Sequence, residues 1–325
     1  MTKISDVAEK TGYSITTISR AINDHPYVSD KTKKKIFDAM KELDYYPNNV
    51  AQQLRGKGTK LIGVIISFVT NPFFTYLVDA IEKAAYQVGY QIVILQTLEE
   101  PEREQRFIEM LKKRQLDGLI MTSLDDDSPE VLKLIAEGKI VVCNRYLGEQ
   151  AIPLVHIDEE KATYEATYYL LAKGYRKIAY VTGNRASLMA ADPRFKGYVK
   201  ALKAFDIAPN SPRRLTISDG KSTLTDVLAL GEAQPDALLV ISDEVASGIL
   251  SQCHLLNINV PETLAIIGFD DQPIAEALYP GLTTVRQPIK EMGAYVAALI
   301  IANIEGREQP EKPELNTKLI IRGTA

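Results

Sequence analysis

Apolar side chains recur at helical spacing through the first 46 residues, in three short segments separated by turn residues. Gly12 is placed to end the first segment, Ser14 can cap the second, and the third runs from near Ser29 to just before Pro47. The positions expected to be buried are Ile4, Val7, Ala8, Ile15 or Thr17, Ile18, Ile22, Ile36, Met40 and Leu43. Three short helices with a short turn between the first two are typical of a helix-turn-helix.

From residue 60 onwards the pattern changes to short, continuous apolar runs that alternate with helical stretches. The runs form two series: KLIGVIIS, YQIVILQT, DGLIMTS and KIVVCNR, and then RKIAYVTG, LTIS, DALLVIS and LAIIGFDD. Continuous apolar strands separated by helices indicate parallel sheets covered on both faces, so we predict an α/β body of two similar doubly wound lobes. A ligand of such a body is expected at the carboxyl ends of the strands, in the cleft between the lobes.

Charge divides the chain in the same place. Residues 1–60 hold nine lysines and two arginines against five aspartates and two glutamates, a net charge of +4, whereas the whole chain carries −4. A basic head on an acidic body indicates nucleic-acid contact by the head, although the run KTKKKIFDAMKEL can equally be the solvated face of a helix.

Other classes of protein find little support in the sequence. The apolar runs are shorter than the about 18 residues that cross a membrane, and the first thirty residues lack a secretion signal, so we expect a cytoplasmic protein without a membrane partner. The three histidines are scattered, and no P-loop, GxGxxG or Ser-His-Asp arrangement is present, so we expect no enzyme, metal or cofactor. Cys143 and Cys253 lie in or near apolar runs, which indicates buried reduced thiols.

The second helix of the head carries the most suggestive chemistry. In a helix-turn-helix this helix lies in the major groove, and its early residues reach the base edges. Here those are Ile15 and Thr16, with Arg20 one turn further along. An arginine can donate two parallel hydrogen bonds to guanine, and small hydroxyl side chains can bind phosphates. The alternative is that this helix only contributes Ile18 and Ile22 to a core.

The stretch YYPNNVAQQLRGKGTK, residues 45–60, joins the head to the body. Its proline suits a helix N-terminus, and the two possible turns that follow are too short to be stable alone. If two copies meet on DNA, Leu54 can act as an apolar wedge in the minor groove, with Arg55 and Lys57 near phosphates. An ordinary interdomain linker is an equally good interpretation.

A series of motifs runs in order along the whole chain: ISDVAEKTGYSITTISRAIN, YYPNNVAQQL, VTNPFF, DGLI, DPRFKGY, ISDEVASG, IIGFDD and LIIRGTA. Together they resemble the LacI/GalR family of bacterial transcription regulators. The resemblance implies a homodimer whose paired heads bind a pseudo-palindromic double-stranded DNA operator. It also implies hinge helices in the minor groove and a periplasmic-binding-protein-like body that binds a small effector, usually a sugar or its phosphate.

Carried across residue by residue, the resemblance assigns base reading to Ile15, Thr16 and Arg20, although Ile15 is less typical at its position. The other head positions contact phosphates or support the fold, and the hinge positions meet the minor groove. The candidate DNA-binding residues are Ser14, Ile15, Thr16, Thr17, Ser19, Arg20, Asn23, Asn48, Ala51, Leu54 and Arg55.

Candidate effector residues follow the strands of both lobes: Phe73, Asn144, Arg194, Asp243 and Asp270. Carboxylates accept hydrogen bonds from vicinal hydroxyls, an arginine donates in a fork, and an aromatic ring covers the apolar face of a sugar. In the family, the positions that match Arg194 and Asp270 commonly hold the effector. The structural alternatives are that Asp270 or Asp243 caps a helix and that Arg194 pairs with an acidic neighbour.

Four segments are therefore expected. They are a helix-turn-helix domain over 1–46, a hinge helix and linker over 47–59, an N-terminal lobe over 60–158 plus 288–316, and a C-terminal lobe over 159–287 plus 317–325. The sequence ends at LIIRGTA without leucine heptads, so we expect a dimer and not a tetramer.

The leading hypothesis is an allosteric repressor of a carbohydrate-utilisation operon. A non-sugar effector such as a purine, or a phosphocarrier protein as co-regulator, stays open, as do the operator and the choice between induction and co-repression. A stand-alone sugar receptor of the periplasmic type is disfavoured by the basic head and the lack of a signal peptide. An enzyme such as a sugar kinase or dehydrogenase is disfavoured by the missing phosphate-binding loop.

Overall fold

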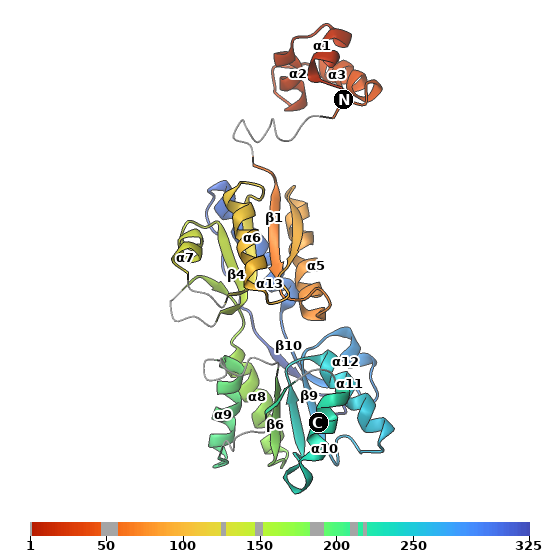
Figure 1. Ribbon diagram of the computed structural model, residues 1–325, viewed down its shortest axis with the longest axis vertical. Coiled ribbons are helices and arrows are strands. Elements are labelled where there is room, and N and C mark those ends of the chain that lie inside the picture. The colour runs from red at the N-terminus through yellow and green to blue at the C-terminus, as the bar shows by residue number, and fades with distance from the viewer. Residues whose placement is uncertain are drawn as a thin grey trace. The chain divides into compact units, whose positions relative to one another are not determined.

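The computed structural model describes residues 2–46, 58–124, 128–146, 152–182, 192–208, 214–216 and 220–325. The chain divides into two compact units, Met1–Thr59 and Lys60–Ala325, which are called the head and the body below (Figure 1). The fold class expected from the sequence is confirmed: a helical head is followed by an α/β body with two mainly parallel sheets.

The head consists of α1 (Ile4–Thr11), α2 (Ile15–Ile22) and α3 (Asp30–Glu42). Gly12 ends α1 with a φ of 73°, a left-handed conformation that glycine adopts without strain. Ser14 caps α2 by accepting a hydrogen bond from the Thr17 N–H at 3.1 Å, and Ser29 caps α3 in the same way. The apolar side chains between the three helices are Val7, Ile18, Ala21, Val28, Ile36, Ala39 and Met40.

The first sheet of the body has the strand order β2-β1-β3-β4-β5, and all of its pairs are parallel. Its strands are β1 (Leu61–Ile66), β2 (Gln91–Gln96), β3 (Gly118–Leu124), β4 (Ile140–Tyr146) and β5 (Leu154–Val155). Its helices are α5 (Pro72–Gln87), α6 (Pro101–Lys112), α7 (Pro129–Ala136) and α13 (Ile289–Glu305). Gly293 lets α13 approach α5 closely, because a Cβ there would lie 3.1 Å from the Ile81 nitrogen.

The second sheet has the order β11-β10-β9-β8-β6-β7. Its strands are β6 (Ile178–Thr182), β7 (Arg214–Thr216), β8 (Ala237–Val240), β9 (Ala265–Asp270), β10 (Thr283–Arg286) and β11 (Lys318–Ile320). Its helices are α8 (Glu159–Ala172), α9 (Pro193–Ala204), α10 (Gly220–Ala229), α11 (Asp243–Leu255) and α12 (Pro273–Ala277). The sheet departs from the expected parallel pattern at one edge, where β11 runs antiparallel to β10.

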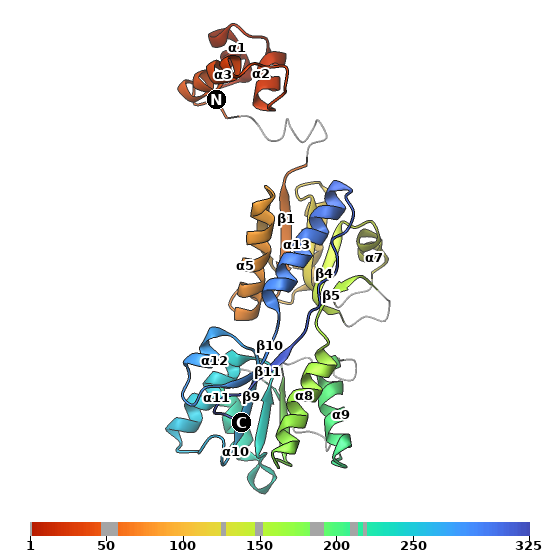
Figure 2. The same cartoon turned by 180° about the vertical axis from the view of Figure 1, so that it is seen from behind.

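The C-terminal segment is fastened to the second sheet by side-chain hydrogen bonds. The Thr324 hydroxyl donates to the Ile266 carbonyl at 2.7 Å and accepts from the Thr283 N–H at 2.8 Å. The Arg322 guanidinium donates to the Leu282 carbonyl at 2.8 Å. The chain crosses from one sheet to the other three times: after β5, after β10 and after α13 (Figure 2).

Both cysteines behave as the sequence indicates. Cys143 and Cys253 are free thiols with no exposed surface. Burial raises the pKa of the Cys143 thiol to about 12 and that of Cys253 to about 11. Neither thiol is therefore reactive at neutral pH, which confirms the expectation of structural, reduced cysteines.

Candidate DNA-binding face and effector site

The exposed side of α2 carries the residues expected to read bases. Ile15 is 47% exposed, and Thr16 and Arg20 are exposed as well, while Ile18 on the opposite side has no exposed surface. Of the alternatives Ile15 and Thr17 for the first inward position, Ile15 is thus wrong, and Thr17 is half-buried. An exposed isoleucine beside a hydroxyl and an arginine is a surface suited to a groove that offers a thymine methyl and base-edge acceptors.

The remaining head candidates mainly hold α2 in shape. The Ser14 and Thr17 hydroxyls lie 2.9 Å apart at the start of the helix. At its end, the Asn23 amide donates to the Ser19 carbonyl at 2.6 Å. The hinge candidates Asn48, Ala51, Leu54 and Arg55 lie outside the described residues.

The carboxyl end of β9 is the most distinctive backbone in the body. Asp270 has a φ of 109° and Asp271 a φ of 53°, so two consecutive aspartates adopt left-handed conformations that cost side-chain-bearing residues about 1–3 kcal/mol each. The Asp271 carboxylate accepts from Arg286 at 2.6 Å and from Arg322 at 2.8 Å, and these ion pairs hold the turn in place.

Asp270 is a buried carboxyl surrounded by amide donors. Its side chain accepts hydrogen bonds from the Gln287 amide at 2.6 Å and the Gln272 amide at 3.2 Å. The pKa of Asp270 is raised to about 7, chiefly by burial and also by the charge of Asp243, while Arg194 and the two amides oppose the increase. A carboxyl with a pKa near neutrality at a strand end is typical of a functional site.

Arg194 lies close to Asp270 but is anchored by other groups. Its guanidinium sits 4.0 Å from the centre of the Phe269 ring, and its Nε donates to the Glu159 carboxylate at 2.7 Å. Burial opposes the positive charge, and the nearby carboxylates of Glu159 and Asp270 more than offset this, so the pKa of Arg194 is raised. Arg194 therefore pairs with an acidic neighbour, but in the interior and not at the surface, and it stays charged.

Asp243 takes a supporting position. It has no exposed surface, and its two oxygens accept from the Gln272 N–H at 2.7 Å and from the Thr284 hydroxyl at 2.5 Å. Burial raises its pKa to about 7. Because Asp243 has no exposed surface, it offers none to a ligand in this arrangement. Its bonds to β10 and to the turn after β9 fix the backbone beside Asp270.

Phe73 and Asn144 lie at strand ends of the first sheet. Phe73 is in the first turn of α5, 6% exposed, and packs edge-on against Phe74. Asn144, near the end of β4, has a φ of 80°, and its amide donates to the Thr122 carbonyl at 3.3 Å. Among the described residues, neither Phe73 nor Asn144 forms a hydrogen bond or ion pair with Arg194 or Asp270. Residues 147–151, 183–191 and 217–219 lie outside the described residues.

Three residues of this site were missed by the sequence analysis: Glu159, Gln272 and Gln287. Glu159 follows the Asp158 cap in the first turn of α8, where an acidic residue is ordinarily explained by the helix dipole. The two glutamines follow strands but carry no charge, so they give no electrostatic signal. Their position immediately after two neighbouring strands is the one feature that could have revealed them.

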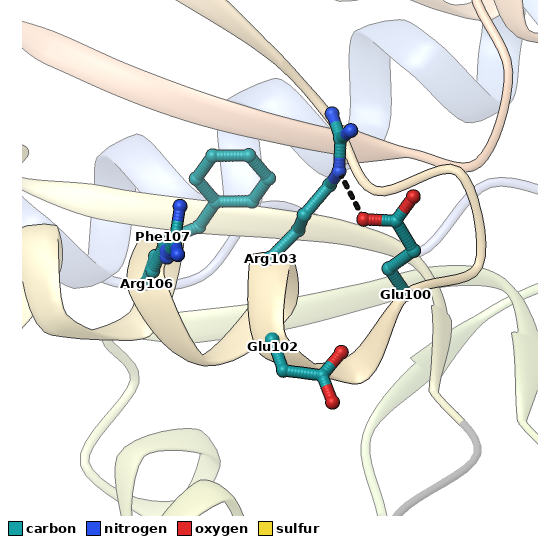
Figure 3. Close-up of a pocket in the computed structure, with 5 residues that line it drawn as sticks. All are labelled: Glu100, Glu102, Arg103, Arg106 and Phe107. Carbon is teal, nitrogen blue, oxygen red and sulfur yellow. Dashed lines mark hydrogen bonds and ion pairs between the residues drawn. The ribbon is translucent and has the colours of Figure 1, made fainter.

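The surface of the body is hollowed near α6 and near Asp270. One hollow, of about 360 Å³, lies along α6 and is lined by Glu100, Glu102, Arg103, Arg106 and Phe107, with Arg103 paired to Glu100 (Figure 3). A second, of about 770 Å³, includes Asp270 and Gln287. Within the described residues, no helix is long and apolar enough to cross a membrane, and no cluster of histidine, cysteine or carboxylate side chains could hold a metal.

Two protein families match the chain over adjoining regions. Residues 3–48 match the family described as bacterial regulatory proteins, lacI family. Residues 59–322 match periplasmic binding proteins and the sugar binding domain of the LacI family. Together the two matches include both units of the structure.

Individual relatives are similar over their full length. The ribose operon repressor of Halalkalibacterium halodurans is 34% identical, with 100% of this chain and 97% of the relative covered. The transcriptional repressor PurR of Vibrio vulnificus is 30% identical, with coverage of 100% and 98%.

Solved structures agree with these relatives. The lac repressor dimer bound to operator and the anti-inducer ONPF has a TM-score of 0.85 at 28% identity, over 99% of this chain and 98% of that chain. A LacI family regulator from Lactobacillus casei with bound sucrose has a TM-score of 0.74 at 33% identity, over 82% of this chain and 99% of that chain.

Proposed function

Because the chain belongs to the lacI family of bacterial regulatory proteins, we propose that it is an allosteric repressor controlled by a small sugar or sugar phosphate. Members of this family are DNA-binding transcriptional regulators and not enzymes. The controlled genes are proposed to be those of a carbohydrate-utilisation operon. The observation that carries the proposal is the buried group of Arg194, Glu159 and Asp270 in a chain whose head exposes Ile15, Thr16 and Arg20.

The head is proposed to read a pseudo-palindromic operator with α2 in the major groove. Arg20 donates to guanine, Ile15 packs against a thymine methyl, and Thr16 contacts a base edge or a phosphate. Ser14, Thr17, Ser19 and Asn23 hold the helix and approach the phosphates. Asn48, Ala51 and Leu54 are proposed to meet the minor groove, with Leu54 as the wedge and Arg55 near the phosphates.

The effector is proposed to bind between Arg194 and Asp270. The carboxylate of Asp270 accepts hydrogen bonds from two vicinal hydroxyls, and the guanidinium of Arg194 donates to ring or phosphate oxygens. Phe73 and Asn144 approach from the first sheet, while Asp243 positions the turn that carries Asp270. A polyhydroxy ligand can satisfy both charges, whereas a purine offers fewer hydroxyl donors to Asp270.

The active form is proposed to be a homodimer. Exposed apolar side chains lie on the body at Tyr86, Val88, Ile94, Leu255 and Tyr279, each more than 45% exposed. Ile94 belongs to β2, an edge strand of the first sheet, where exposed apolar residues favour association. The lac repressor, similar over nearly the whole chain, is described as a dimer on its operator.

Control of DNA binding is proposed to pass through the two lobes, residues 60–158 with 288–316 and 159–287 with 317–325. The two lobes are proposed to adopt two arrangements, and the paired heads bind DNA in only one of these. An effector that binds one arrangement more tightly than the other changes the populations of the two arrangements. The coupling is reciprocal: an effector that weakens operator binding must itself be bound more weakly when operator is present.

The experiment that tests the proposal combines operator selection with effector screening. The full chain is used to select duplexes from a random pool, and a panel of sugars, sugar phosphates and purines is screened by melting temperature. We expect a two-fold-related site and a stabilising sugar whose effect disappears in Arg194→Ala. Stabilisation by a purine alone would replace the sugar assignment, and failure to select any sequence would contradict DNA recognition by α2.

A further inference from the structure

The hollow of about 770 Å³ is a second candidate site in the body. It is lined by α5 and α13 from the first sheet and by α12, β10 and β11 from the second. The passage from β10 into α13, beside which it lies, can be followed in Figures 1 and 2. Of the five effector candidates, only Asp270 lines it, whereas Arg194, Phe73, Asn144 and Asp243 do not. The hollow is therefore a neighbour of the proposed effector site and shares one carboxyl with it.

Several charges around this hollow already have partners. Asp271 is paired with Arg286 and Arg322, and Asp79 is paired with Lys83 at 2.7 Å. Because these charges are already neutralised by their partners, they do not favour a charged ligand.

Four other lining residues form no ion pair or hydrogen bond through their side chains with any described residue: Lys290, Lys318, Glu276 and Glu291. All four are exposed, and none lies within 4.0 Å of an oppositely charged group of a described residue. Two cations and two anions thus face one hollow without neutralising each other. A ligand that carries both signs can pair with both.

The start of α13 adds a preference for the negative end of such a ligand. Pro288 occupies the N-cap position, and no side chain caps the first turn. Uncapped N–H groups and the positive end of the helix dipole attract an anion, and Lys290 stands in that turn. A carboxylate or phosphate is therefore best placed between the start of α13, Lys290 and Lys318.

Gln287 adds a preference for the positive end. Gln287 is 5% exposed and lines the hollow, and its amide nitrogen donates to Asp270. Its Oε1 is buried and has no hydrogen-bond partner among the residues that the structure describes. A buried acceptor without a donor is unfavourable. A ligand N–H group that reaches Gln287 beside the Asp270 carboxylate supplies the missing donor.

We propose that this hollow is a second ligand site for a small zwitterion of the α-amino acid class. The ammonium group lies against Asp270, Gln287 and Glu276, and the carboxylate lies against Lys290, Lys318 and the start of α13. Because elements of both sheets line the site, its ligand stabilises one arrangement of the lobes. Only this last step, coupling to the operator, rests on the proposed function.

The test measures the melting temperature of the full chain with each of the twenty common α-amino acids, and the dissociation constant of any that stabilises it. Acetate, methylammonium and inorganic phosphate serve as probes that carry one sign of charge. We expect an amino acid to stabilise the chain and the single-charge probes not to. Lys290→Gln with Lys318→Gln, and separately Glu276→Gln, are expected to weaken binding about tenfold.

The matched control is Lys312→Gln, an exposed lysine of the same C-terminal stretch that does not line the hollow, and binding there should be unchanged. All of these positions are exposed, so the unliganded melting temperatures should agree closely. No stabilisation by any amino acid, equal binding of acetate or phosphate, or equal binding by the lining variants would each overturn the proposal. The rise in melting temperature caused by the sugar should persist in Lys290→Gln, whereas Arg194→Ala abolishes it. This difference separates failure of the second site from failure of the effector site.

Discussion

Neutralising Asp270 is expected to make the chain more stable at alkaline pH while removing its response to effector. Burial raises the pKa of this carboxyl from 3.8 to about 7. An acid with a raised folded-state pKa contributes stability that is fully present below its unfolded pKa and is lost as the pH rises through its folded pKa. The change corresponds to about 4 kcal/mol of unfolding free energy, lost between pH values of about 4 and 7.

Asp270→Asn keeps the shape of the side chain and removes its charge. One of the two hydrogen bonds that Asp270 accepts, from Gln287 or Gln272, is lost at a cost of about 1 kcal/mol. We therefore expect the variant to be within about 1 kcal/mol of the unchanged chain at pH 5 and about 3 kcal/mol more stable at pH 8.

The assay is urea-induced unfolding at pH 5 and pH 8, followed by circular dichroism because the chain contains no tryptophan. Asp271→Asn is the matched control: it removes the partner of Arg286 and Arg322 and should lower stability at both pH values. A stability difference for Asp270→Asn that does not change with pH, or a loss of stability at pH 8, would refute the reasoning.

Three further changes test the head and the Arg194 anchor. Arg20→Ala should cost roughly 1–3 kcal/mol of specific operator binding in fluorescence anisotropy and relax the preference at one base step, whereas Lys34→Ala should weaken all sequences alike. Ser14→Ala should lower the stability of the head by about 1 kcal/mol in calorimetry, through loss of the α2 cap, with exposed Ser5→Ala as its control. Glu159→Gln should lower the free energy of unfolding by about 1.5–3 kcal/mol, because it removes a buried charged hydrogen bond to Arg194. The control Glu160→Gln breaks only the exposed pair with Lys200 and should change stability by less than about 1 kcal/mol. Equal effects of the two variants would contradict the anchoring role of Glu159.

The helices of the head and the long strands of the body could be predicted because local signals agree with the fold. Gly12, Ser14 and Ser29 mark helix ends by chemistry that acts within one turn. Continuous apolar runs such as LIGVII are buried on both faces of a parallel sheet and so stand out in the sequence. Strands β5, β10 and β11 have two to four residues and lack such a run, which is why they were missed.

The candidate site could be predicted only in part, because its partners are distant in sequence. Arg194 and Asp270 were proposed through the family resemblance, and the charge of each affects the pKa of the other. Glu159 lies 35 residues from Arg194, and no local pattern links the two. Asp243 was expected in the cleft because it follows a strand, but its burial depends on the neighbouring β10 strand, which the sequence did not reveal.

The central claim is that the Arg194 and Asp270 group controls DNA binding by the head. The most direct measurement is the affinity of the full chain for its selected operator, with and without the sugar that raises its melting temperature. The account predicts that the sugar changes operator affinity in the unchanged chain, and that Arg194→Ala and Asp270→Asn bind operator but no longer respond. An unaltered sugar response in both variants would contradict it.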